Sequence, residues 1–252
     1  MNLGKIFLLF FSAIFGFSQI NAQVDSTKYI NSSITSFGFG MGADLPGGDL
    51  SIRYGSNLNF ALQGEYITSA NWIFGSELLF IFGANVKEDV LAPFRTSTGV
   101  ILGDDNQIAD VFLRQRGIFI GAGIGRLIQF NRESRSGIKF NLHAGILQHH
   151  IRFADERNSV AQIRAGRHIG YDRLTRGFSL KESVGYKHLS HDRRLNFEFM
   201  FDFIQGFTSE VRAFNFDTGL ASIPSRLDLM FGIRIVWNLP FYHGGSEAAI
   251  YY

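Results

Sequence analysis

The chain has 252 residues, among them 27 Phe, 28 Gly, 4 Pro and no Cys, and its formal net charge is +2. A charge this close to neutral gives no reason to expect nucleic acid among its partners, and a chain without cysteine has neither disulfides nor a lipid-anchored cysteine. Beyond the first two dozen residues no apolar run approaches the roughly 18 residues of a membrane helix, which excludes a helical membrane protein.

The first 22 residues have the pattern of a secretory signal peptide. Lys5 supplies a positive charge, Ile6 to Phe17 form an apolar stretch, and Ala22 is a small residue of the kind that precedes the cleavage site. We therefore expect residues 1–22 to be removed on export and residues 23–34 to form a periplasmic segment.

Apolar and polar residues then alternate in eight separate stretches. Successive side chains of a β-strand point to opposite faces, so this alternation predicts strands with one apolar and one polar face. The predicted strands are Thr35 to Ala43, Asn57 to Ile67, Trp72 to Val86, Gly117 to Phe130, Ile138 to Phe153, Gly177 to Leu189, a seventh that begins at Leu195, and Arg226 to Phe241.

The last predicted strand shows the alternation most clearly. One face is entirely apolar and carries Leu227, Leu229, Phe231, Ile233, Ile235, Trp237, Leu239 and Phe241. The opposite face is largely polar and carries Arg226, Asp228, Met230, Gly232, Arg234 and Asn238.

The connections between these strands alternate between short and long. The short ones are Thr68 to Asn71, Asn131 to Gly137 and Ser190 to Arg194, and the long ones are Asp44 to Ser56, Lys87 to Arg116, Ala154 to Arg176 and Thr208 to Ser225. Bacterial outer-membrane barrels have an even number of strands, short periplasmic turns and long outer loops. The sequence thus predicts an all-β fold: a closed, antiparallel, up-and-down transmembrane barrel of eight strands over residues 35–242. Both termini, including a tail at 243–252, are then periplasmic.

A water-soluble barrel of the lipocalin type is the alternative, and it would turn its polar face outward. The polar faces here combine many glycines with charges of both signs, opposite nearly unbroken Phe, Leu and Ile. This pattern favours the membrane barrel with a polar interior.

The inward faces contain five acids and five bases: Glu65, Glu77, Glu198, Asp202 and Asp228 with Lys139, Lys181, Lys187, Arg226 and Arg234. Buried charges need partners, so we expect a network of salt bridges in which Arg234 reaches Glu198 or Asp202. Eight strands leave just enough room for side chains to fill the lumen. The network then plugs the interior; the alternative is a path for protons or substrate.

Two charges interrupt the outward apolar faces. Arg126 is close enough to the periplasmic end for its side chain to reach the lipid headgroups. Glu182 lies deeper, and it indicates either a β-bulge that shifts the alternation or a contact with another membrane protein.

The third long connection and its flanks are rich in arginine: Arg152, Arg157, Arg164, Arg167, Arg173 and Arg176. They form either a solvated loop or a surface that contacts lipopolysaccharide phosphates or an acidic partner, because guanidinium groups bind such groups in bidentate fashion.

Few residues suggest chemistry. His188 and Ser190 resemble the catalytic pair of outer-membrane lipid A deacylases, which makes a lipid A-modifying enzyme one alternative. His149 and His150 are adjacent, so they point to opposite faces and do not share a metal. We expect no catalytic residues, no cofactor and no metal.

Several short stretches resemble a family of small outer-membrane barrel proteins of Bacteroidota. The clearest are Gly170 to Thr175, Gln205 to Thr208, Asn215 to Gly219 and Arg226 to Leu229. Some members of such families are accessory subunits of export or barrel-assembly machines. The resemblance implies a non-catalytic protein with outer-membrane lipid, lipopolysaccharide and other envelope proteins as partners. A narrow channel is a further alternative.

Overall fold

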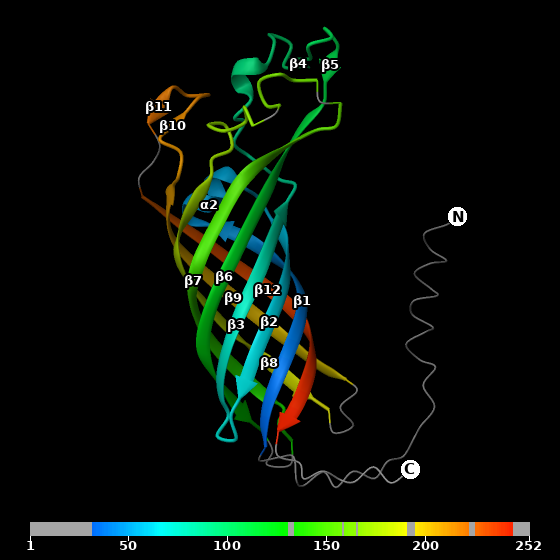
Figure 1. Cartoon of the computed structure of the whole chain (residues 1–252), viewed down its shortest axis with the longest axis vertical. Coiled ribbons are helices and arrows are strands. Elements are labelled where there is room, and N and C mark those ends of the chain that lie inside the picture. Colours follow the sequence, from blue (N-terminus) through cyan, green and yellow to red (C-terminus); the bar gives the residue numbers. More distant parts are fainter. Residues whose placement is uncertain are drawn as a thin grey trace, which may run out of the picture.

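The computed structural model describes residues 32–130, 134–157, 159–164, 166–190, 195–221 and 225–243. Eight long strands form a closed antiparallel barrel in the order β1-β12-β9-β8-β7-β6-β3-β2 (Figure 1). Their bounds are β1 Ser33–Gly47, β2 Asn57–Ile67, β3 Trp72–Gly83, β6 Val111–Gln129, β7 Gly137–Asp155, β8 Thr175–Leu189, β9 Asn196–Glu210 and β12 Arg226–His243. The predicted fold is confirmed. The predicted signal peptide lies outside the described residues.

The barrel has two different ends. Short connections join β2 to β3, β6 to β7 and β8 to β9 at one end, which we call the turn end. The long connections lie at the other, the loop end (Figure 1). Ser33 pairs with His243 where β1 and β12 close the ring, so the described chain begins and ends at the turn end.

Several strands extend farther toward the loop end than the alternation predicts. β6 begins at Val111 instead of Gly117, and β1 continues to Gly47 instead of Ala43. The β6 pairing with β7 runs without interruption to Val111 and Asp155. On the outward face of this extension Arg114 and Arg116 lie between Phe112 and Ile118, so the continuous apolar alternation ends before the strand does. β3 is shorter than predicted, and only an isolated bridge between Tyr54 and Val86 continues its line.

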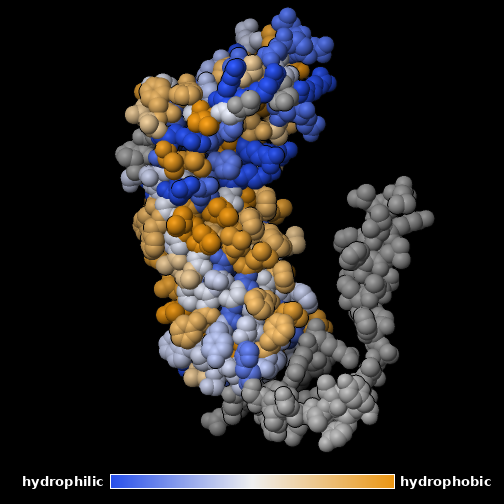
Figure 2. All heavy atoms as spheres, in the orientation of Figure 1, coloured by the Kyte–Doolittle hydropathy of each residue, from blue (hydrophilic) through white to orange (hydrophobic). Residues whose placement is uncertain are grey.

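The outward faces form an apolar band around the barrel, and Figure 2 shows it on one side below a hydrophilic loop end. Met41 is 71% exposed and Ile235 61% exposed, and each of the eight strands contributes large exposed apolar side chains. Charged residues such as Lys139 and Glu198 are instead fully buried. A water-soluble barrel has the reverse arrangement. No helix in the described part of the chain has the length and apolar character to cross a membrane.

Side chains fill the lumen in layers. An apolar cluster closes the turn end, and it comprises Ile34, Ile67, Ile73, Leu127 and Leu189. Above it lie layers of charged residues, followed by a larger apolar cluster that includes Phe119, Leu147 and Ile204. Phe119 is fully buried and occupies the space beside Gly121, where a Cβ atom would lie only 2.6 Å from its ring.

The long connections fold over the loop end of the lumen. They include a short helix, α2 (Gly48–Arg53), a 3-10 turn, η2 (Ala92–Phe94), and two small hairpins, β4–β5 (Ile101–Leu102 and Ile108–Ala109) and β10–β11 (Phe214–Asn215 and Leu220–Ala221). Leu50 of α2 and Val90, Leu91 and Ile163 of the connections belong to the same buried cluster as Phe119. The interior is therefore capped at this end by the loops themselves.

Candidate functional site

A first group of charges lies inside the barrel near the turn end. Two lysines alternate with two glutamates from four different strands. Lys187 Nζ lies 2.6 Å from Glu198 and 3.1 Å from Glu65, and Lys139 Nζ lies 2.8 Å from Glu198 and also contacts Glu65. Gln63 and Asn141 donate further hydrogen bonds to these carboxylates. Each cation thus bridges both anions, and the four side chains close a ring across the lumen.

A second group lies beside the first, farther toward the loop end. Arg234 Nη1 is 2.6 Å from Glu77 and Nε is 3.2 Å from Asp202, while Lys181 contacts Glu77 and lies 3.5 Å from Asp202. Ser183 donates a further hydrogen bond of 2.6 Å to Asp202. Of the two acids that the sequence suggests for Arg234, the structure brings it to Asp202 and not to Glu198. Its second acid, Glu77, comes from β3 across the lumen, which adjacency along the sheet does not reveal.

Asp228 belongs to a separate cluster, although the sequence places it with the other charges. Its Oδ2 accepts hydrogen bonds from Thr208 and from His149, whose Nε2 is 2.9 Å away, and its Oδ1 lies 3.3 Å from Arg226. Tyr54 packs edge-on against the His149 ring. Sequence reasoning missed His149 and Tyr54 as members. Tyr54 follows α2 in a long connection and enters the lumen only through the folding of that connection, whereas His149 lies at an inward position of β7, where the alternation could have identified it.

The two main groups hold the interior closed. Lys139, Lys181 and Lys187 are fully buried together with Glu198, and the neighbouring carboxylates are at most a few per cent exposed. Removing one member would leave a buried charge without its partner, which is strongly unfavourable. The arrangement braces opposite walls of the barrel, and apolar layers lie on both sides of it.

A further set of ion pairs, which we call the loop network, joins the long connections to one another. Arg53 of α2 contacts Glu88 and Glu210, each at 2.7 Å, and Arg173 contacts Glu88 and, in bidentate fashion, Asp217, also at 2.7 Å. These residues come from all four long connections and the end of β9. Burial lowers the pKa of both guanidinium groups, but the surrounding carboxylates outweigh burial and raise each pKa above its ordinary value.

Arg173 is therefore not a surface arginine, and its prediction as a partner-facing residue is wrong. Its side chain is only 3% exposed, and its φ of 47° lies in the left-handed region, which the ion pairs help to hold. Arg164 pairs with Asp104 at 2.9 Å on the surface of the loops. Arg157 and Arg167 are exposed, and Arg167 donates a long hydrogen bond to the carbonyl of Ala161.

Glu182 points outward from the middle of β8. It pairs with Leu142 on β7 and Phe203 on β9 in ladders that run through all of β8 without an extra residue, so the predicted alternative of a bulge is wrong. Gln205 donates a hydrogen bond of 3.4 Å to its carboxylate. The carboxylate borders a shallow hollow of about 570 Å³ on the outer wall, whose apolar lining is Phe140, Val184, Phe201, Phe203 and Phe231.

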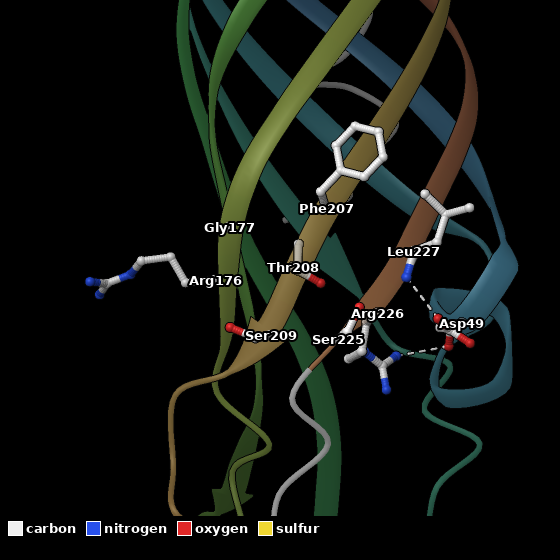
Figure 3. A pocket seen from close by; sticks show the side chains of 9 residues that line it. All are labelled: Asp49, Arg176, Gly177, Phe207, Thr208, Ser209, Ser225, Arg226 and Leu227. Carbon is white, nitrogen blue, oxygen red and sulfur yellow. Dashed lines mark hydrogen bonds between the residues drawn. The ribbon is translucent and has the colours of Figure 1, made fainter.

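Another hollow of about 570 Å³ lies at the loop end of β8, β9 and β12. Phe207 and Leu227 form its apolar side, and Ser209 and Ser225 line it as well. Figure 3 shows Arg226 bent toward Asp49, whose carboxylate accepts a hydrogen bond of 2.7 Å from the backbone N–H of Leu227. Arg176 lines the hollow at its opposite edge, and its side chain points away from Asp49 and Arg226 in the same view.

His188 and Ser190 lie at the turn end of β8, and the geometry does not join them. The His188 ring contacts Phe197 and lies 3.4 Å from the hydroxyl of Ser136, not from Ser190. The nearby acid Asp192 lies outside the described residues. Within the described ranges no group of three or more His, Asp or Glu side chains is arranged to hold a metal ion. Arg126 stacks on Trp72 at the turn end, 4.8 Å from the ring centroid.

These features define a closed eight-stranded barrel with an apolar outside, a charged and filled inside, and loops tied together by ion pairs. Among solved structures, the chain is similar to Ail, the attachment invasion locus protein of Yersinia pestis, with 11% identity, coverage of 82% of this chain and 99% of that one, and a TM-score of 0.42. It is also similar to Neisserial surface protein A (8% identity, 81% and 96% coverage, TM-score 0.44). A further similar structure is that of the outer membrane protein OprG of Pseudomonas aeruginosa (10% identity, 84% and 98% coverage, TM-score 0.44). No protein-family model and no curated protein matches the sequence.

Proposed function

We propose that this chain is an integral outer-membrane protein that acts without catalysis, as an accessory subunit of an envelope protein complex. The apolar band supports the membrane location, because water would be a poor solvent for so many exposed Phe, Ile and Leu side chains. The alternation of short and long connections supports an orientation with the turn end in the periplasm and the loop end outside, as is typical of outer-membrane barrels.

The outward carboxylate of Glu182 is the observation that supports a role as a subunit of a complex. It lies six residues from Arg176 and four from Tyr186 on the same strand, about 20 Å and 13 Å along the strand, which places it well inside the band. An ionised side chain facing hydrocarbon is costly, and no cation lies within ion-pair distance of Glu182 in the described part of the chain.

A polar partner within the membrane removes this cost. The hollow beside Glu182 is lined by aromatic rings and has room for a side chain of another membrane-embedded protein, and a hydrogen-bond donor or cation on that side chain would satisfy the carboxylate. A second copy of this chain arranged symmetrically about this point would bring two like charges together, so we favour a different protein.

Affinity purification at native expression, in mild detergent, tests this proposal. We expect a membrane protein to co-purify with the wild-type chain and to be lost from the Glu182→Gln variant, whereas Glu156→Gln, a change of the same kind in an exposed loop, retains it. A photo-crosslinking residue in place of Phe201 should capture the same protein, and one in place of Leu58 on β2, across the ring, should not. Recovery of the wild-type chain only as a lone monomer would overturn the proposal.

A narrow channel is the alternative that the filled interior argues against. The ion-pair groups and the apolar layers leave the lumen occupied by side chains from end to end, so we expect no conductance in planar bilayers. A porin inserted in the same bilayer provides the positive control. Reproducible single-channel steps from the purified chain would contradict the closed interior.

A further inference from the structure

A group of arginines that the loop network does not use lies on the outer wall. Arg114 and Arg116 of β6, Arg152 of β7 and Arg176 of β8 all point outward at the loop end, and we call them the wall arginines. Arg114 pairs directly with Arg152 across the two strands, and Arg116 pairs with His150. None of the four forms an ion pair with an acid among the described residues.

The wall arginines begin where the apolar band ends. The last continuous apolar row across this side of the barrel runs through Leu78, Ile120, Ile146, Phe178, Phe207 and Leu227. Along their strands, the backbone of Arg176 lies two residues beyond Phe178 and that of Arg116 four beyond Ile120, about 7 and 13 Å from that row, while Arg114 and Arg152 lie six residues, about 20 Å, beyond it. The nearer two positions are at the height of the polar headgroups of the outer leaflet next to such a band, and the other two lie farther out.

Like charges directly opposite each other in a sheet are unfavourable without a counter-ion. The arginines of the loop network show the contrasting case, because Arg53 and Arg173 are each saturated by two carboxylates. On the wall, aromatic rings and amides take the place of acids: Arg116 lies 5.5 Å from the centroid of Phe82, Arg114 lies 5.7 Å from that of Phe112, and Arg176 donates to Gln148. These contacts orient the guanidinium groups but leave their charge uncompensated.

We propose that the wall arginines bind the phosphate groups of a phosphorylated lipid of the outer leaflet. Guanidinium groups hold phosphate through two parallel hydrogen bonds, and neighbouring arginines on β6, β7 and β8 offer several such pairs of donors. The exposed apolar row below them provides the surface for the acyl chains of the same molecule. The hollow of Figure 3, which Phe207 and Leu227 line beside Arg176, continues this amphipathic surface onto β12.

Lipid titration of the purified full-length chain, followed by native mass spectrometry, tests the site. The probes are bisphosphorylated lipid A, the same lipid without phosphates, and inorganic pyrophosphate as a soluble anion. We expect the Arg114→Gln/Arg152→Gln variant to bind bisphosphorylated lipid A about tenfold more weakly than wild type. The matched control, Arg157→Gln/Arg167→Gln, removes two exposed loop charges and should bind as the wild type does.

Thermal unfolding separates a ligand site from a structural role. In detergent without anionic lipid, the Arg114→Gln/Arg152→Gln variant should be at least as stable as the wild type, because two like charges that face each other across β6 and β7 have been removed. With bisphosphorylated lipid A, only the wild type and the loop control should gain stability. If the double variant does not fold, Arg152→Gln alone serves the same comparison.

Three results would overturn the proposal. One is equal binding of lipid A with and without phosphates, and another is unchanged affinity in the Arg114→Gln/Arg152→Gln variant. The third is displacement of the lipid by pyrophosphate at equal concentration, which would indicate a site for a soluble anion. The Glu182→Gln variant should bind the lipid normally, so failure of this inference and failure of the subunit proposal are distinguishable.

Discussion

The interior and the outer wall of this barrel both carry charges of both signs, but the surroundings of these charges differ. Inside, Lys139 and Lys187 each contact the same two glutamates, and Arg234 lies between two acids. On the wall, Glu182 contacts the side-chain amide of Gln205 and no cation among the described residues, and Arg114 faces Arg152. The same residue types thus have two kinds of surroundings: within the lumen they form ion pairs that hold the structure together, and on the wall we propose that they contact partners from outside the chain.

Removal of an interior acid should have the largest effect on the free energy of unfolding. Glu77→Ala leaves Lys181 and Arg234 buried with Asp202 as their remaining acid, and we expect the free energy of unfolding to fall by about 3–5 kcal/mol. Urea unfolding in lipid vesicles, followed by tryptophan fluorescence, measures this change. Glu156→Ala in an exposed loop is the control and should have little effect. A loss below about 1 kcal/mol for Glu77→Ala would mean that the ion pairs do not support the barrel.

Within the loop network we expect a smaller and more local effect. Arg173→Gln removes the contacts to Glu88 and Asp217. The free energy of local opening of the long connections should therefore fall by about 2 kcal/mol, while the barrel strands stay protected from exchange. Hydrogen exchange of residues 84–110 and 211–221 reports this directly. Arg167→Gln, on the exposed part of the same connection, should leave exchange unchanged. Equal exchange in both variants would show that the loops are held by their apolar contacts alone.

Removal of the outward charge from the wall should instead raise the free energy of unfolding. Glu182→Leu removes a charge from the apolar band, so the isolated barrel should become more stable in lipid by up to about 1 kcal/mol, whereas the proposed contact with another subunit should be lost. The same unfolding assay applies, with Ser183→Ala, an inward change on the same strand, as the comparison. Destabilisation by Glu182→Leu would indicate that this carboxylate supports the barrel itself.

Much of the fold was predictable because the alternation of side chains is a local property of a strand. Asn57 to Ile67 is a strand with the predicted bounds, and the outward faces around Phe39 and Ile235 are those that the pattern indicates. Strand ends at the loop end were less predictable, since Arg114 and Arg116 interrupt the apolar pattern while the backbone pairing continues. Inward charges were recognisable for the same local reason.

The sequence by itself determined that the chain alternates with period two over eight stretches, that its connections are alternately short and long, and which face of each strand is apolar. Only the tertiary structure decided which charges meet. Glu77 and Arg234 are 157 residues apart in the sequence, and Arg173 forms ion pairs with Glu88 and Asp217, which come from two other connections. Pairing across a lumen depends on the stagger of the closed sheet and on how loops fold over its end. Neither is encoded in the periodicity of a single strand.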